Sequence, residues 1–247
     1  GFESDVLSYD VYQSIAGALP AGIELVPTKE IVRLLRAVKE PEEMARLRKA
    51  IEVGDQALET VMGILRPGQT EKEIAWRLEQ EMRNVGAGPW LLEIIVAGGP
   101  AGAMAHARAT ERPLQAGQPI VIDMGCRWEG YHSDMTRTVI LGEPDAKFNE
   151  IYDIVLRAQQ QAEAGICAGT LGSEAHAMAA EVIGQAGYGD AFGHGLGHGV
   201  GLAIHELPVL SPRSDSVLAA GHVFSVEPGI YLPGWGGVRI EDLATIG

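Results

Sequence analysis

Two aspartates stand where a carboxylate is costly unless something compensates its charge. Asp123 ends the apolar run Pro119-Ile120-Val121-Ile122, and Asp134 follows beyond a turn at Trp128-Glu129-Gly130-Tyr131. This layout predicts a hairpin that directs both carboxylates to one side. A carboxylate at the end of a buried strand needs a cation or hydrogen-bond donors. Two hydrogen-bonded turn aspartates would also fit, so this hairpin alone leaves both interpretations open.

The second half of the chain repeats the arrangement with glutamates. Glu227 closes Val223-Phe224-Ser225-Val226, and Glu241 ends Gly237-Val238-Arg239-Ile240. Four carboxylates would then come from two hairpins, and bringing them together without a cation raises their pKa values and destabilises the fold. A pair of divalent metal ions resolves that conflict.

Histidines gather between the two acidic pairs. His194 and His198 lie in the glycine-rich segment Gly193–Gly201, and His205 follows soon after. Carboxylates suit Mn²⁺, and an imidazole ligand also admits Co²⁺, Zn²⁺ or Fe²⁺. A flexible loop with solvent-facing histidines is the alternative interpretation. Two metal ions can activate water to attack a carbonyl, and histidines such as His106, which precedes the first acidic pair, can stabilise the tetrahedral intermediate.

Amphipathic helices are expected beside these strands. From Pro41 to Leu65 apolar residues recur at steps of three and four, until Arg66-Pro67-Gly68 ends the helix. Thr70 and Glu73 form a capping box that starts a second helix. Further expected elements are strands over Ile94–Ala97, Ile120–Met124 and Thr138–Leu141, a helix after Pro144, and a helix over Ser173–Gln185.

A weak internal repeat relates the two halves of the chain. An offset of 101 residues aligns Gly68 with Gly169 and Glu73 with Glu174. In each half, helices precede strands that end in acidic residues. The repeat therefore predicts two similar α/β halves that face each other, although coincidence among 32 glycines is the alternative.

Composition excludes several classes of protein. The chain has 247 residues, 46% hydrophobic content and a formal net charge of −14, which argues against nucleic-acid binding. The sequence offers no apolar run long enough for a membrane span and no signal peptide, so we expect a soluble cytoplasmic protein. Cys126 and Cys167 match neither a zinc-finger spacing nor a disulfide framework, and both are expected to be small core residues.

These motifs resemble the pita-bread metallopeptidases, the family of methionine aminopeptidase, aminopeptidase P and prolidase. The resemblance runs from about Pro41 to the last residue. Its carriers are Ile122-Asp123-Met124-Gly125, Ser133-Asp134-Met135-Thr136-Arg137-Thr138, Gly197-His198-Gly199 with Ile204-His205-Glu206, Val226-Glu227-Pro228-Gly229, and Arg239-Ile240-Glu241-Asp242. The resemblance implies an α/β pita-bread (creatinase/aminopeptidase) fold, in which two pseudo-symmetric halves surround a curved antiparallel sheet.

Site roles follow from the resemblance, residue by residue. It implies two divalent metal ions, with Mn²⁺ as the first candidate and Co²⁺, Zn²⁺ or Fe²⁺ as alternatives. Their ligands would be Asp123, Asp134, His198, Glu227 and Glu241. In the family pattern Glu227 also handles the proton of the attacking water. His106 and His205 match the catalytic histidines on the substrate side, and His194 joins His205 in binding the substrate.

The implied activity is hydrolysis of short proline-containing peptides at an Xaa-Pro bond, by a prolidase (Xaa-Pro dipeptidase) or an Xaa-Pro aminopeptidase. One residue departs from the prolidase pattern. Prolidases often carry an arginine after His205-Glu206-Leu207-Pro208 that can bind the carboxylate of a dipeptide, whereas this chain has Val209. Arg213 lies nearby in the sequence and could substitute. The preference for dipeptides or longer peptides therefore stays open.

Domain organisation also follows from the resemblance. Residues 1–40 are expected to be the remnant of a creatinase-like N-terminal domain with its linker, and residues 41–247 the catalytic domain. A start at Gly1 without Met suggests a fragment or a processed product. Since the family often forms dimers, a homodimer is expected.

Three alternatives to a competent peptidase remain. A pita-bread binding protein without catalysis and a creatinase-like C–N hydrolase would both lack bound metal, and the complete ligand set disfavours them. In the third alternative the missing N-terminal portion contributes to the substrate pocket, so that the chain would bind metal yet turn over poorly.

Overall fold

The computed structural model describes residues 1–88 and 93–247, and its contacts divide the chain into two compact units, Gly1–Arg36 and Ala37–Gly247. The first unit has no buried residue, in agreement with the short apolar runs of this region. Its strands β1 and β2 pair in parallel. The elements of this part of the chain are β1 (Phe2–Glu3), α1 (Tyr9–Ala18), β2 (Pro27–Thr28) and α2 (Ile31–Ala37), the last of which ends in the second unit.

The division falls a few residues before the domain boundary expected at Pro41. Val38 forms a β-bridge with His222, and the Lys39 amide donates to the Gly221 carbonyl at 2.9 Å. Residues 37–40 therefore belong with the second unit in the structure. The assignment of the preceding segment to an N-terminal domain stays a prediction.

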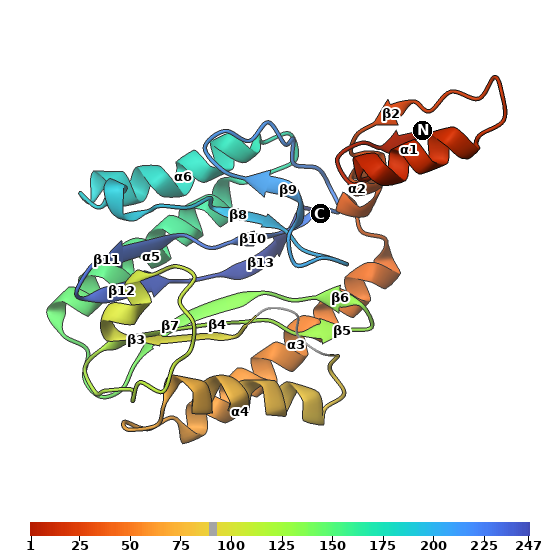
Figure 1. Ribbon diagram of the computed structural model, residues 1–247. Helices are drawn as coiled ribbons and strands as arrows, with labels where there is room; N and C mark the ends of the chain where they lie inside the picture. The colour runs from red at the N-terminus through yellow and green to blue at the C-terminus, as the bar shows by residue number, and fades with distance from the viewer. Residues whose placement is uncertain (89–92) are drawn as a thin grey trace. The chain divides into compact units, whose positions relative to one another are not determined.

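The second unit consists of two similar halves, and in Figure 1 its strands lie between α3 with α4 and α5 with α6. The predicted helices and strands are confirmed with shifts of a few residues at their ends. The first half contains α3 (Pro41–Ile64), α4 (Glu71–Asn84), β3 (Ile95–Gly98), the 3₁₀ helix η1 (Gly99–Ala103), β4 (Pro119–Met124), β5 (Arg127–Trp128), β6 (Tyr131–His132) and β7 (Met135–Ile140). The second contains α5 (Ala146–Gly165), α6 (Gly172–Gln185), η2 (Gly189–Ala191), β8 (Gly197–Gly199), β9 (Glu206–Leu210), β10 (Val223–Val226), β11 (Gly229–Leu232), β12 (Gly236–Arg239) and β13 (Asp242–Thr245).

Helix ends follow from local chemistry. Pro41 occupies the first turn of α3, where the missing N–H costs nothing. At α4 the Thr70 hydroxyl accepts from the Glu73 amide at 3.2 Å, and the Glu73 carboxylate accepts from the Thr70 amide at 2.7 Å. The predicted capping box is thus present, and it satisfies two amides that the helix itself leaves unpaired.

Antiparallel strands run in the orders β3-β4-β7 and β13-β10-β8-β9. The two sheets meet where the Glu241 amide donates to the Thr136 carbonyl at 3.1 Å. In each half a long antiparallel pair, β4 with β7 or β10 with β13, ends in a smaller hairpin, β5 with β6 or β11 with β12. The expected pseudo-symmetry around an antiparallel sheet is therefore confirmed.

One detail of the second half differs from the expectation. Glu227 and Glu241 were expected to end two strands of one hairpin, but β10 pairs with β13, and the β11–β12 hairpin lies between the two glutamates. The apolar run at Ile230 therefore forms a strand that the acidic pattern alone did not show.

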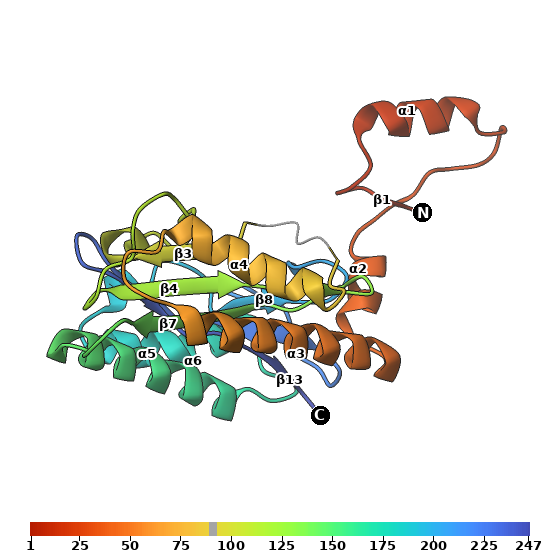
Figure 2. The same cartoon turned by 90° about the horizontal axis from the view of Figure 1, so that it is seen from below.

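Helices cover one face of the sheet. In the turned view of Figure 2, α3 and α5 lie on the same face. In agreement, the charges of Arg137 and Asp242 affect the pKa values of both Asp55 on α3 and Glu163 on α5. Each half has its own core, formed with α3 and α4 in the first and with α5 and α6 in the second. The opposite face is left for the acidic side chains.

Two further observations concern burial. Cys126 is buried as expected, but Cys167 is exposed, so its assignment to the core was wrong. Cys167 directly follows the C-cap of α5, where the chain leaves the helix and turns at the surface.

Within the described residues, no helix has the length and apolar character needed to cross a membrane.

Candidate active site

Strand alternation places Asp123 on the face away from the helices. Ile120, Ile122 and Met124 belong to the core with α3 and α4, so Asp123, between the last two, points the other way. The same rule acts in β10, where Phe224 and Val226 enter the other core. The following acid, Glu227, therefore lies on the side of Ser225, whose hydroxyl donates to Glu227 Oε1 at 3.0 Å.

Asp134 and Glu241 occupy matching positions, each just before the second strand of its pair. Glu241 is 2% exposed, and the Thr136 hydroxyl donates to its Oε2 at 2.6 Å. Its Oε1 is buried and has no hydrogen-bond partner among the described residues. A buried, unpaired carboxylate oxygen costs free energy unless a cation binds there.

His198 brings an imidazole to this cluster from β8. Its Nδ1 lies 3.1 Å from the Gly199 carbonyl, so the hydrogen of the neutral ring belongs on Nδ1. Nε2 then turns its lone pair toward Glu227 Oε1 at 3.4 Å and Asp134 Oδ2 at 3.6 Å. Facing lone pairs repel one another, and a metal ion between them removes that repulsion.

Burial raises the pKa values of all four carboxyl groups, and repulsion between acids adds to the rise at Asp134, Glu227 and Glu241. Burial is the largest cause at each, and the charges of the neighbouring acids raise the pKa of Asp134 and Glu241 well above the usual range. The pKa of Glu227 rises to about 7, although Arg239 opposes the rise. Burial also raises the pKa of Asp123, again against the effect of Arg239.

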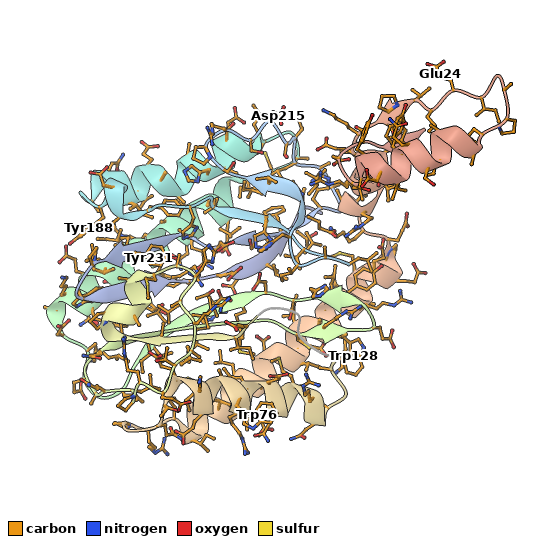
Figure 3. All side chains as sticks on the ribbon, viewed as in Figure 1. Glu24, Trp76, Trp128, Tyr188, Asp215 and Tyr231 are labelled. Carbon is orange, nitrogen blue, oxygen red and sulfur yellow. The ribbon has the colours of Figure 1, made fainter. Side chains whose placement is uncertain are left out.

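Arg239 is the buried cation of the site, with a side chain 3% exposed. It donates to Asp123 Oδ2, to the Thr136 hydroxyl at 3.0 Å and to the Tyr231 hydroxyl at 2.8 Å. Tyr231, labelled in Figure 3, is also 2.8 Å from Nε2 of His194. Because Nδ1 of His194 donates to the Gly195 carbonyl at 2.7 Å, Nε2 of the neutral ring accepts from the Tyr231 hydroxyl.

Sequence reasoning assigned no role to Arg239 or Tyr231. The sequence did contain an indication for Arg239, because an arginine in the apolar run of β12 needs an acidic partner once it is buried. No pattern in the sequence identifies that acid as Asp123. The partner lies in the other half of the chain, and only the pairing of the two sheets brings it within reach.

The remaining histidines surround the acids. The His205 ring packs edge-on against the His198 ring, with centroids 4.2 Å apart and planes at 89°. His106 follows η1 and lies on the pocket wall. Both nitrogens of His194 have partners, because Nδ1 lies 2.7 Å from the Gly195 carbonyl, and burial lowers its pKa to about 4.

One pocket of about 690 Å³ collects the whole predicted set, a volume suited to a short peptide. The structure brings together all eight site residues predicted from the sequence: His106, Asp123, Asp134, His194, His198, His205, Glu227 and Glu241. Val209 lies on the wall as well, with Arg108, which is ion-paired to Glu93 at 3.0 Å. Arg213 is exposed and is not part of the pocket's described lining.

The donor set fits a divalent cation. Ligand atoms of Asp134, His198 and Glu241 lie within 4.8 Å of one another, and Glu241 Oε1 lacks any other partner among the described residues. Carboxylate oxygens with one imidazole suit Mn²⁺, Fe²⁺, Co²⁺ or Zn²⁺. Because four acids, one buried and three partly buried, face one buried arginine in this lining, a divalent charge would also offset their repulsion.

Comparisons with known proteins agree with this geometry. Residues 45–247 match the sequence profile of Metallopeptidase family M24. The chain is 41% identical to the Xaa-Pro dipeptidase of Pyrococcus furiosus over 88% of its own length and 62% of the relative's. The solved structure of an Xaa-Pro dipeptidase from Bacillus anthracis is similar, with a TM-score of 0.96 and 44% identity, over 100% of this chain and 69% of that chain. The structure of an X-Pro aminopeptidase from Thermotoga maritima has a TM-score of 0.93 and 39% identity, over 99% of this chain and 69% of that chain. The chain thus spans about two thirds of the length of these relatives.

Proposed function

The chain belongs to Metallopeptidase family M24, and we propose that it is a dinuclear-metal peptidase that hydrolyses short peptides at an Xaa-Pro bond. The observation that carries the proposal is the convergence of four carboxylates, one buried and three partly buried, and the unprotonated nitrogen of His198 on one pocket. The Xaa-Pro preference is supported by the names of the relatives, an Xaa-Pro dipeptidase and an X-Pro aminopeptidase.

We propose Asp123, Asp134, His198, Glu227 and Glu241 as the metal ligands. The two acidic pairs of the pseudo-symmetric halves supply oxygen donors from both sides, and His198 adds a nitrogen. Mn²⁺ is the proposed ion, because carboxylates dominate the set. When bound, the ions supply Lewis-acid activation of water and of the peptide carbonyl.

The chain's own residues handle the proton and the developing charge. Glu227 is the proposed proton acceptor; the Ser225 hydroxyl fixes its Oε1 at 3.0 Å, which holds the carboxylate in one orientation. His205 and His106 face the pocket as hydrogen-bond donors for the carbonyl oxygen as it becomes an oxyanion.

Substrate binding falls to the pocket wall. His194 is fixed by Gly195 and Tyr231, so it offers a ring surface to the peptide rather than a free nitrogen. Ile95 and Val209 add apolar surface on which a proline ring can pack. The homodimer and the cytoplasmic location stay predictions from the sequence.

Metal-restored hydrolysis tests the proposed function. Chelator-treated chain should cleave neither Ala-Pro nor Ala-Pro-Ala, and addition of Mn²⁺, Co²⁺ or Zn²⁺ should restore cleavage of at least one. Ala-Ala and Ala-Ala-Ala serve as controls for the proline requirement, and the Asp134→Ala variant controls for free metal. Failure of every metal to restore cleavage in a chain that binds two ions would refute the assigned substrate class.

A further inference from the structure

A buried ion pair lies behind the loop that carries His205. Lys39 Nζ donates to Glu206 Oε1 at 2.8 Å, and the two side chains are 1% and 7% exposed. Lys39 precedes α3, whereas Glu206 begins β9, so the pair joins segments far apart in the chain. Burial of two charges repays its desolvation cost only when geometry and further hydrogen bonds are favourable.

Further hydrogen bonds hold the pair in place. Lys39 Nζ also donates to the Ala37 carbonyl at 3.2 Å, and the Lys39 amide donates to the Gly221 carbonyl at 2.9 Å. The second oxygen of Glu206 accepts from the Ala203 amide at 3.2 Å. The fixed ammonium of Lys39 thus helps to hold the Glu206 carboxylate, and the carboxylate in turn holds the backbone at Ala203.

This arrangement closes the loop around His205. The Gly201 amide donates to the Ala203 carbonyl at 3.0 Å, and the His132 amide donates to the Gly201 carbonyl at 2.8 Å. Within residues 1–88 and 93–247 no hydrogen bond holds the His205 ring, which touches the His198 ring at 4.2 Å between centroids. The position of the ring therefore depends on the backbone between Ala203 and Glu206.

We propose that Lys39 is a positioning residue for His205, acting through the Glu206 carboxylate and the Ala203–Glu206 turn. The proposal rests on the proposed function, in which His205 donates to the oxyanion. Lys39 lies outside the described lining of the pocket, and its ammonium donates to Ala37 and Glu206, neither of which is a proposed metal ligand. Loss of its charge should weaken the hold on the Glu206 carboxylate, and with it the turn that orients the His205 ring.

Gly201 gives a second way to perturb the pair while both charges remain. A Cβ at this position would overlap the Glu206 carboxylate and lie 3.1 Å from Lys39 Cε. The φ of Gly201 is outside the left-handed region, so alanine fits the backbone. Gly201→Ala should therefore displace Glu206 without the loss of an ion.

The test compares Lys39→Met and Gly201→Ala with the unmodified chain, all loaded with Mn²⁺. We expect kcat for the better Xaa-Pro substrate to fall roughly tenfold, as for other residues that orient a catalytic group, while KM and metal content stay unchanged. Lys72→Met is the matched control, because Lys72 pairs with Glu111 at 2.9 Å but the side chains are 58% and 75% exposed. Unchanged kcat in both folded test variants would overturn the proposal.

Coupling to His205 separates positioning from a general structural role. In a His205→Ala background, Lys39→Met should lower kcat by less than about twofold, because the group that it positions is gone. An equal loss in both backgrounds would overturn the proposal. If Lys39→Met does not fold, Lys39→Met with Glu206→Gln removes both charges and takes its place; native kcat in that variant would also overturn it.

A measurement that does not depend on turnover separates the positioning role of Lys39 from the proposed peptidase function. The side-chain NMR signal of His205 in the metal-free chain, assigned by its loss in His205→Ala, should shift in Lys39→Met and not in Lys72→Met. If the unmodified chain cleaves no Xaa-Pro peptide but the signal shifts, the proposed function fails and the positioning inference stands. An unshifted signal would overturn the positioning inference alone.

Discussion

Replacement of Glu227 by glutamine should stabilise the metal-free protein at alkaline pH and give no benefit near pH 4. Burial raises the pKa of Glu227 from 4.5 to about 7 in the folded protein. For a carboxyl group with a raised pKa, the stabilising contribution is fully present below the unfolded value and is lost as pH rises through the folded value. Glutamine remains neutral throughout, so Glu227→Gln avoids the cost of a buried charge.

The magnitude follows from the two pKa values. A rise from 4.5 to about 7 is about 2.5 units, and at 1.36 kcal/mol per unit the variant should gain about 3 kcal/mol above pH 8. The gain should shrink steadily between pH 7 and pH 4.5. Ser225 can still donate to the amide oxygen of glutamine, so the local hydrogen bond persists.

The measured quantity must be the difference between variant and unmodified protein. His194 and His198 have pKa values lowered from 6.5 to about 4 by burial, and their contribution is present above pH 6.5 and lost as pH falls to 4. That trend opposes the one from Glu227 in each protein. The contribution of His194 cancels in the difference, whereas that of His198 does not, because its Nε2 lies 3.4 Å from Glu227 Oε1. Glu59→Gln on the exposed face of α3 is the matched control.

Urea denaturation in the presence of a chelator, at intervals from pH 4 to pH 8.5, provides the free energies of unfolding. Curves for Glu227→Gln and the unmodified protein that run parallel across this range would refute the reasoning. Saturating Mn²⁺ should narrow the difference, because the unmodified protein then gains binding free energy, about 2.7 kcal/mol at a hundredfold excess over Kd, that the variant lacks in part.

Three further predictions concern the site. Asp134→Ala and Glu241→Ala should each abolish Mn²⁺-stimulated turnover and lower bound metal, as measured by elemental analysis, since each removes a proposed ligand; retained turnover in both would contradict the proposed two-metal mechanism. His205→Ala should lower kcat roughly 10²-fold to 10³-fold with metal content intact, and loss of metal would instead show a ligand role. Val209→Arg should raise kcat/KM for Ala-Pro relative to Ala-Pro-Ala, because it places a cation on the pocket wall for the dipeptide carboxylate; an unchanged ratio would exclude this wall from carboxylate recognition.

Local rules made much of the fold predictable. Capping at Thr70 depends on residues three apart, and the helical stripe from Pro41 depends on spacing within one segment. The positions of Asp123 and Asp134 beside strands followed from alternation in the same way. These signals involve neighbours in the chain, so they survive without knowledge of the rest of the structure.

Other predictions were wrong or missing because they depend on contacts between segments that are distant in the chain. Cys167 is small and apolar enough for a core, but the end of α5 places it at the surface. The strand at Ile230 was not predicted, because the spacing of Glu227 and Glu241 indicated one hairpin, whereas β11 pairs with β12 in a separate hairpin between them.

The sequence alone determined the types of the proposed metal ligands, their order in the chain and the two-fold repeat, because side-chain chemistry and strand alternation are properties of short segments. Only the tertiary structure decided that Arg239 meets Asp123, that Tyr231 joins Arg239 to His194, and that Lys39 reaches Glu206. These partners come from separate segments, and a buried charge is stabilised by whichever opposite charge the packing of the halves brings within a few ångströms of it.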